Sequence, residues 1–349
     1  MNNNIKDKRI LLLCENFYDY DIKIKEELLK LGAKDVYLKN AEYFFTSLRN
    51  LKDFSLRLFL KNPFKRQQWS KDFEKEIKNM HFDLFLCIEN TCFTKKFIQF
   101  LRKKNPGIKT VLFLWDTYKT QQGEYKHYRH LFDKTFSFDR DDAKKYGMEY
   151  FPDFYIPQKI SDNFKYDISF VGTAYASTTR HRIEIINYVY TFCKDNNLSH
   201  FLYLRTFEPQ KKSLNPFRYI INNYIRTPEF WKLIDKFRNE EWLHFKSISL
   251  DCCNAVQSRS RVLLDLSRKD RQGMTINCIT ALAHGQKLIT TNQRLKEESF
   301  YDPNMIYIID ENNPQLNISF WNRPNKKVDL SYLRLDNWLL HIFDEKNFI

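Results

Sequence analysis

The sequence has very little glycine and lacks the short motifs that mark several common catalytic sites. Only 7 of its 349 residues are glycine. It contains no G-x-G-x-x-G and no G-x-x-x-x-G-K-[ST], so neither a classical dinucleotide fingerprint nor a P-loop is expected. Its 7 cysteines form no C-x-x-C pair and its 8 histidines form no H-E-x-x-H pattern. We therefore expect no metal site.

Long apolar runs are also missing. The chain is polar through Arg9, and the apolar run that follows is only Ile10–Leu13. No stretch approaches the roughly 20 apolar residues that a membrane-spanning helix needs. No signal peptide is recognisable either. We therefore expect a cytoplasmic protein that is at most peripheral to the inner face of the plasma membrane.

The charge of the chain is strongly positive, with a formal net charge of +14 from 57 basic and 43 acidic residues. Nucleic acid, an anionic membrane surface or a phosphorylated substrate could each be the partner of such a charge. The joint richness in lysine, asparagine, isoleucine, phenylalanine and tyrosine is equally typical of an AT-rich genome. The charge alone therefore decides little.

Short apolar runs alternate with helical patterns along the chain, which indicates βαβ units, parallel sheets and an α/β fold. The length and the 43% hydrophobic content suit two domains of about 150–180 residues each. A polar stretch at 157–166 separates them, so we predict domains at 1–157 and 167–329, and a helical tail at 330–349 that can pack back on the first domain. The predicted strands are 9–15, 35–38, 83–88, 110–115, 134–138, 168–171, 200–205, 261–267, 287–291 and 305–309.

Open parallel sheets bind ligands beyond the carboxyl ends of their strands, so the residues that follow each predicted strand are candidates. Two such rows facing each other across a cleft would form a two-substrate site. In the first half the candidates are Glu15, Asn16, Glu89, Asn90, Asp116, Asp139 and Asp141. In the second half they are Gly172, Thr173, Arg205, residues 268–275 and Asn292.

The most informative segment is 263–292, LLDLSRKDRQGMTINCITALAHGQKLITTN. A buried strand leads into a polar loop, Gly273 permits a tight turn, and a helix begins near Thr275. Backbone N–H groups at a helix N-terminus can bind a diphosphate, and Thr275 can cap the helix or donate its hydroxyl to phosphate. An ordinary strand–loop–helix crossover fits this spacing equally well.

Two further segments carry candidate residues. In FVGTAYASTTR (170–180), Gly172 permits close approach of the backbone to a ligand, and Arg180 can clamp a phosphate; a solvated surface arginine is the alternative. In LFLWDT (112–117), Asp116 directly follows an apolar strand and can act as a general base toward a sugar hydroxyl, or can cap the next segment. Asp139 and Asp141 are expected to cap the helix that follows them.

These segments together resemble the CgeB-like and lipopolysaccharide-biosynthesis glycosyltransferases. Residues 263–292, with YDPNMIYIID at 301–310, resemble the C-terminal domain of that family, and LFLWDT, FSFDRDDAKKYG and DISFVGT occur in the family's order. The resemblance covers most of the chain and is weakest over 42–80 and 206–246. It implies a GT-B fold, in which two Rossmann-like domains turn their parallel sheets toward a central cleft. The first domain would hold the acceptor and the second a nucleotide-sugar donor.

The resemblance also implies the activity and the residues that serve it. The enzyme would move a sugar from a nucleotide sugar to a glycan or lipid-linked acceptor of the bacterial surface, such as lipopolysaccharide or capsule, with no metal and no other cofactor. In such an enzyme the strand-end residues of the first half, Glu15, Asn16, Glu89, Asn90 and Asp139, are expected on the acceptor side, with Asp116, which follows its own strand, as the base. By position, Gly172, Thr173 and Arg180 match the first donor loop, and Gln272, Gly273, Met274 and Thr275 match the phosphate loop.

The chain departs from the family's pattern in the helix after Thr275. Relatives often carry arginine where Asn277 stands, and usually carry a ribose-binding glutamate where Thr280 stands. A non-catalytic protein that binds a glycan or a nucleotide is therefore an alternative to an enzyme.

Two other kinds of partner are weighed on the basic residues. The basic and aromatic stretch 43–69 can lie on anionic lipid, or can be an ordinary amphipathic pair packed on the sheet. Binding to nucleic acid has no recognition motif to support it.

Overall fold

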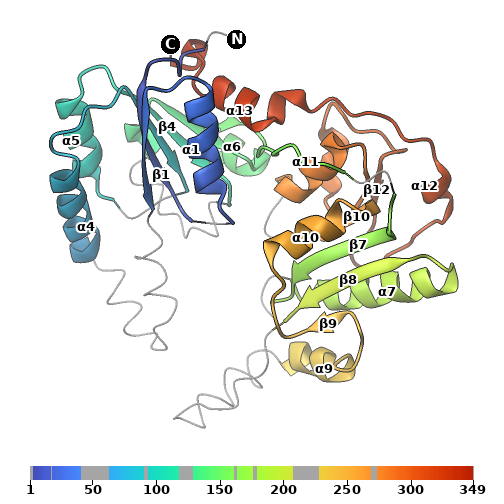
Figure 1. The fold of residues 1–349 in the computed structure, drawn as a ribbon. Helices are drawn as coiled ribbons and strands as arrows, with labels where there is room; N and C mark the ends of the chain where they lie inside the picture. Colours follow the sequence, from blue (N-terminus) through green and yellow to red (C-terminus); the bar gives the residue numbers. More distant parts are fainter. Residues whose placement is uncertain are drawn as a thin grey trace, which may run out of the picture. The chain divides into compact units, whose positions relative to one another are not determined.

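The computed structural model describes residues 3–16, 18–40, 63–89, 93–117, 129–160, 163–175, 179–206, 228–268 and 273–348. The chain divides into two compact units. Unit 1 comprises Met1–Phe154 with Ser331–Ile349, and unit 2 comprises Tyr155–Leu330. Within the described residues each unit contains one six-stranded sheet whose paired strands are all parallel (Figure 1). The predicted α/β class is confirmed.

The sheet of unit 1 has the strand order β2-β1-β3-β4-β5-β6. Its strands are β1 (Arg9–Cys14), β2 (Asp35–Asn40), β3 (Leu84–Ile88), β4 (Lys109–Leu114), β5 (Lys134–Ser137) and β6 (Glu149–Tyr150). Its helices are α1 (Tyr20–Lys30), α4 (Pro63–Glu76), α5 (Lys95–Lys104), α6 (Arg140–Tyr146) and α13 (Leu335–Ile342), with 3-10 turns at Arg129–Leu131, Ser331–Leu333 and Glu345–Phe348.

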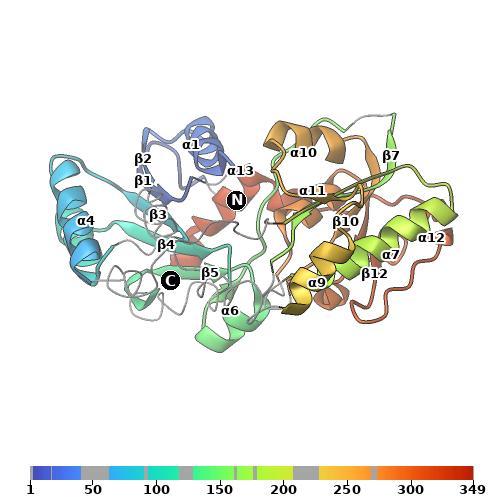
Figure 2. The same ribbon diagram turned by 90° about the horizontal axis from the view of Figure 1, so that it is seen from below.

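Helices cover both faces of this sheet, because successive side chains of a strand point to opposite faces and both sets are apolar. Leu11 and Leu13 of β1 face a core that includes Phe73 of α4 and Phe97 of α5. On the other face Phe113 of β4 meets Trp338 of α13 edge to face, with 4.6 Å between ring centroids. Figures 1 and 2 show α4 and α5 on one side of the sheet and α1 and α13 on the other.

The sheet of unit 2 has the order β12-β11-β10-β7-β8-β9. Its strands are β7 (Tyr166–Thr173), β8 (His200–Arg205), β9 (Leu243–His244), β10 (Ser260–Asp265), β11 (Lys287–Thr290) and β12 (Ile306–Ile308). Its helices are α7 (His181–Asp195), α9 (Pro228–Lys236), α10 (Leu250–Gln257), α11 (Ile276–Ala283) and α12 (Ser319–Asn322), with a 3-10 turn at Gln293–Glu297.

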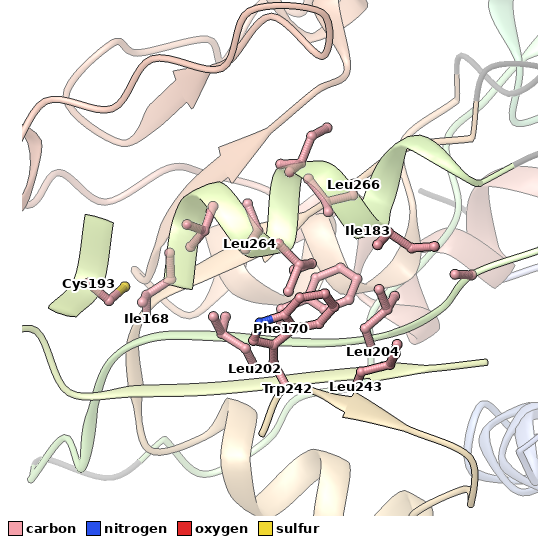
Figure 3. Packing of buried hydrophobic residues seen from close by; sticks show 14 of the residues in the cluster. Ile168, Phe170, Ile183, Cys193, Leu202, Leu204, Trp242, Leu243, Leu264 and Leu266 are labelled. Atoms are coloured by element: carbon pink, nitrogen blue, oxygen red, sulfur yellow. The ribbon is translucent and has the colours of Figure 1, made fainter. Parts of the chain in front are cut away.

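The main core of unit 2 lies between this sheet and α7. Figure 3 shows Phe170 of β7 and Trp242 beside each other there, with Leu264 of β10 and Ile183 of α7 close by. Trp242 is 1% exposed. Helices α10 and α11 lie on the opposite side of the sheet from α7 (Figures 1 and 2). Because helices cover both faces of the sheet, the ends of its strands are left for ligands.

Helix ends follow the glycine and proline signals of the sequence. Gly32 and Gly285 adopt left-handed φ values of 91° and 75° just after α1 and α11, where a side chain would be strained. Pro63 and Pro228 occupy the first positions of α4 and α9, where a missing N–H costs no helical hydrogen bond. Most of the basic and aromatic stretch 43–69 lies outside the described residues.

None of the helices in the described part of the chain is both long enough and apolar enough to cross a membrane.

We predict that Trp338→Ala lowers the free energy of unfolding of unit 1 by about 3–5 kcal/mol, because a large aromatic side chain leaves a cavity. Trp338 is 0% exposed, and its Nε1 donates to the Pro152 carbonyl over 3.0 Å. Ile22→Ala is the matched control, since Ile22 is 43% exposed on α1. Urea unfolding followed by fluorescence measures both variants. Equal losses in the two would show that α13 is not part of the core of this unit.

Candidate functional site

Each sheet has one point at which the strand order changes direction. In unit 1 the chain passes from β1 to β2 and then returns to the other side of β1 with β3. In unit 2 it passes from β7 to β8 and β9 and returns to the other side of β7 with β10. Crossovers that leave on opposite sides open a crevice beyond the strand ends at this point, where such sheets bind ligands. The carboxyl ends of β1 and β3, and of β7 and β10, are therefore the candidate sites.

The N-terminus of α11 follows the carboxyl end of β10 through the loop that the sequence marked. Thr275 is the N-cap, and its Oγ1 accepts a hydrogen bond of 3.3 Å from the N–H of Cys278. The N–H groups of Ile276 and Asn277 come too early in the helix to have an intrahelical acceptor. The first turn contains no acidic residue. This helix end therefore offers donors and a positive dipole to an anion.

Asp265, the last residue of β10, organises the loop that leads to this helix. Its carboxylate accepts hydrogen bonds from Thr275 Oγ1 at 3.1 Å, from Ser267 Oγ at 3.2 Å and from Thr290 Oγ1 at 3.3 Å. The Thr275 hydroxyl thus has two acceptors inside the protein, Asp265 Oδ1 at 3.1 Å and Cys278 Sγ at 3.3 Å, and through them it helps to shape the loop. Asn292 Nδ2 holds the Gly273 carbonyl at 3.3 Å on the other side of the loop.

The second candidate loop begins at the end of β7. A Cβ atom on Gly172 would lie 2.4 Å from Cζ of the Phe170 ring, which is itself 4% exposed in the core. Packing against Phe170 therefore accounts for this glycine, whereas the sequence had suggested the approach of a ligand. The carbonyl of Thr173 accepts hydrogen bonds from Thr179 Oγ1 at 3.1 Å and from Arg182 Nη1 at 2.8 Å.

Arg180 precedes α7 and forms an ion pair with Glu229 of α9. The side chains are 40% and 68% exposed, so this pair contributes little to stability. A guanidinium that a carboxylate can bind can also bind a phosphate, because both offer two oxygens in a similar plane. Glu229 therefore binds the Arg180 guanidinium, the group that the sequence analysis assigned to a donor phosphate.

Arg182 and His181, in the first turn of α7, were not singled out from the sequence. Arg182 donates to the carbonyls of Thr173 and Leu266, and so connects the ends of β7 and β10. His181 Nε2 lies 3.0 Å from the Ser267 carbonyl and 3.5 Å from a Glu311 carboxylate oxygen. Leu266 and Ser267 lie more than 80 residues along the chain from the two α7 side chains that bind them. No local sequence pattern therefore identifies Arg182 and His181.

Acidic side chains gather at the carboxyl ends of β1 and β3 in unit 1. Glu89 is 1% exposed and adopts a left-handed φ of 44°, while Glu15 is half-buried and Asn16 exposed. Burial, and then the charges of nearby groups that include Asp21, Glu15 and Glu89, raise the pKa of the Cys14 thiol well above its ordinary value. These carboxylates therefore lie near enough to Cys14 to affect its thiol.

Backbone strain marks the same edge. Tyr18 and Asp19, in the turn between β1 and α1, have φ values of 52° and 58°. Left-handed φ values are costly for residues other than glycine, and they cluster at functional sites. With Glu89, three such residues lie beside the point where the strand order of unit 1 changes. The sequence pattern singled out Glu89 by its position after a strand, but it gave no signal for this backbone strain.

Asp116 is half-buried two residues beyond β4, and its Oδ1 accepts a hydrogen bond of 2.8 Å from the N–H of Thr117. Asp139 is buried and caps α6, accepting from the N–H groups of Asp141 at 3.0 Å and Asp142 at 3.1 Å. The predicted capping role of Asp139 is confirmed, whereas Asp141 lies in the first turn of that helix instead of capping it.

The remaining predicted residues differ in exposure or lie outside the described part of the chain. Arg205 ends β8 and is half-buried, Asn277 is exposed, and Met274 and Thr280 are buried at 1% and 7% exposure. Asn90 and Gln272 lie outside the described residues. Across the described ranges, no three histidine, cysteine, aspartate or glutamate side chains gather in a way that could hold a metal ion.

Comparison with solved structures identifies the fold of the chain. The chain resembles the N-terminal domain of Candida albicans trehalose-6-phosphate phosphatase, with a TM-score of 0.58, 12% identity and coverage of 98% of this chain and 97% of that one. The E. coli trehalose-6-phosphate protein bound with UDP-2-fluoro glucose has a TM-score of 0.52 and 10% identity, with coverage of 97% of this chain and 96% of that one. Methanocaldococcus jannaschii UDP-GlcNAc 2-epimerase, in complex with UDP-GlcNAc and UDP, has a TM-score of 0.50 and 12% identity, with coverage of 97% of this chain and 99% of that one. The chain has a GT-B fold.

The GT-B fold is what these comparisons establish, because identities of 10–12% over nearly whole chains show a shared architecture and no more. No family model matches the chain, and no curated protein is significantly similar to it in sequence. An activity of this GT-B chain has to be argued from its own residues.

We predict that Thr275→Ala lowers the stability of unit 2 by about 1–2 kcal/mol, because it removes the helix cap and a donor to Asp265. Thr275→Ser keeps the hydroxyl and should cost less than half as much. Thermal unfolding of both variants makes the comparison. If serine costs as much as alanine, the hydroxyl is not the group that holds the loop.

Proposed function

We propose that this chain is a metal-independent glycosyltransferase that binds a nucleotide sugar in unit 2 and transfers its sugar to a bacterial surface glycan or a lipid-linked precursor. The family we favour is the CgeB-like and lipopolysaccharide-biosynthesis group. The observation that carries the proposal is the N-terminus of α11, which offers unbonded main-chain donors at the point where the strand order of unit 2 changes.

A leaving nucleoside diphosphate fits this helix end on physical grounds. Bond cleavage between sugar and phosphate places charge on the diphosphate, and fixed N–H dipoles stabilise that charge without reorganising. Ile276 and Asn277 supply such N–H groups, and Arg180 can add a bidentate contact once Glu229 releases it. Proteins of the same fold were solved with UDP-2-fluoro glucose and with UDP-GlcNAc and UDP, which supports a uridine nucleotide as the first ligand to test.

The acceptor in this proposal binds at the carboxyl edge of unit 1. Glu15 and Glu89 can accept hydrogen bonds from sugar hydroxyls, and Asp116 is the proposed general base. A lipid-linked acceptor would place the protein at the inner face of the plasma membrane, where its net charge of +14 favours anionic lipid.

A non-catalytic GT-B protein that binds a glycan or nucleotide is the second candidate. It is favoured by Asn277 and Thr280, which stand where the family that the sequence resembles often carries an arginine and usually carries a ribose-binding glutamate. Neither side chain supplies a charge, and Thr280 is buried at 7% exposure. Such a protein would bind a nucleotide sugar without turning it over.

A thermal-shift screen with UDP, GDP, CMP and dTDP sugars tests the proposal, because a ligand that binds only the folded state raises Tm. We expect one nucleotide series to raise Tm, and the best donor to be hydrolysed or transferred in a product assay. Asp116→Asn should keep the shift and lose at least tenfold in turnover. Binding without turnover in the wild type would favour the non-catalytic protein, and the absence of any shift would reject both.

We predict opposite effects for the two residues of the Arg180–Glu229 pair. Arg180→Ala should weaken binding of the preferred nucleotide roughly tenfold, since a charge-assisted hydrogen bond contributes about 1.5–3 kcal/mol. Glu229→Gln frees Arg180 from an exposed ion pair that costs about 0.2–1 kcal/mol to break, and should strengthen binding by roughly 1.5-fold to fivefold. Calorimetric titration measures both. Weaker binding in Glu229→Gln would show that Glu229 does not compete with the ligand.

A further inference from the structure

The first turn of α7 holds three carbonyl groups at the mouth of the candidate donor site. Arg182 donates from Nη1 to the Thr173 carbonyl and from Nε to the Leu266 carbonyl, each over 2.8 Å, and its Nη2 also contacts the latter. His181, 8% exposed, lies with Nε2 3.0 Å from the Ser267 carbonyl. Thr173 ends β7, and Leu266 and Ser267 follow β10, so one helical turn fixes both strand ends.

These contacts also set the direction of the peptide N–H groups. In a trans peptide the C=O and the following N–H point in opposite directions. The Leu266 carbonyl points to Arg182, and the N–H of Ser267 accordingly points away, to Thr291 Oγ1 at 2.9 Å. By the same geometry the bond from His181 turns the N–H of Arg268 away from α7. The side chains of α7 thus orient the main chain where it enters the loop before α11.

The charge of Arg182 matters at this edge as well. The carboxyl ends of parallel strands present carbonyl oxygens, which carry partial negative charge, and Asp265 adds a carboxylate beside them. An anionic ligand would be repelled by this group of oxygens unless a cation covered them. Arg182 bonds to carbonyls on both sides of the point where the strand order changes.

We propose that Arg182, assisted by His181, is a positioning residue for the diphosphate of a nucleotide ligand. It acts through the main chain: it holds the ends of β7 and β10 in register, and with them the start of α11, whose N–H groups bind the ligand. This inference rests on the proposed function. Arginine suits this position because its planar guanidinium donates from separate nitrogens to two carbonyls in a fixed geometry, which a single ammonium does not reproduce.

Arg261 provides the matched control on the same strands. It lies in β10 near the opposite, amino end, where its Nη1 donates to Asp167 Oδ1 at 3.1 Å and its Nη2 to the Trp321 carbonyl at 3.4 Å. It therefore also connects two segments through one guanidinium. A purely structural role predicts the same consequences for the loss of either arginine.

The experiment compares wild type, Arg182→Lys and Arg261→Lys by calorimetric titration with UDP, GDP, CMP and dTDP, and by Tm. We expect similar losses of Tm in the two variants. We expect Arg182→Lys to weaken binding of the preferred nucleotide at least tenfold, and Arg261→Lys to change it less than twofold. If Arg182→Lys does not fold, His181→Phe is judged against Arg261→Lys by the same criterion.

A loss of affinity in Arg182→Lys no greater than in Arg261→Lys overturns the inference while leaving the proposed function in place. A wild type that binds none of the four nucleotides rejects the proposed function, and the inference with it.

Discussion

Parallel pairing is the constraint on which the rest of this structure depends. A parallel strand cannot be followed by a tight turn, so each strand is followed by a crossover, and all carboxyl ends of a sheet meet at one edge. In each unit the order of strands changes direction once, between β1 and β3 and between β7 and β10. Helices cover the faces, so the polar groups that the cores do not use are found at these edges. Glu89, with its left-handed φ of 44°, and Thr275 are examples in the two units.

The edge of unit 2 combines features that favour an anion with one that opposes it. The dipole and open N–H groups of α11 attract a phosphate, while the carboxylate of Asp265 repels it. Asp265 nevertheless shapes the loop, because three hydroxyl groups donate to it. In the proposed function, Arg182 and Arg180 offset this repulsion, Arg182 by donating to carbonyl oxygens at the strand ends and Arg180 by binding the phosphate in place of Glu229. The direction of the backbone and the charges around it therefore depend on the same residues at this edge. For this reason no single residue in the sequence predicted the site.

The sequence predicted the long elements well and the site only in outline. The strand His200–Arg205 was predicted with its bounds, because a short run of aromatic and aliphatic residues between polar ends is a strong local signal. The two-residue strands β6 and β9 and the short helix α10 were missed, because such lengths carry no period. Local spacing predicted that Thr275 caps the helix or donates to phosphate, and the structure shows the cap. Arg182 and Asp265 depend instead on partners distant in the sequence or on the pairing of strands. The sequence analysis explained Gly172 by the close approach of a ligand to its backbone. The structure shows instead that the ring of Phe170, two residues away, leaves no room for a side chain at this position.

The central claim is that the main-chain N–H groups at the start of α11 bind the diphosphate of a nucleotide. Hydrogen–deuterium exchange of the full chain, with and without saturating UDP, tests it most directly, because an amide that donates to a bound phosphate exchanges more slowly. We expect that peptides covering residues 273–279 become protected and that the slowing is lost in Arg182→Lys. Protection confined to other parts of the chain, with exchange at 273–279 unchanged, would contradict it.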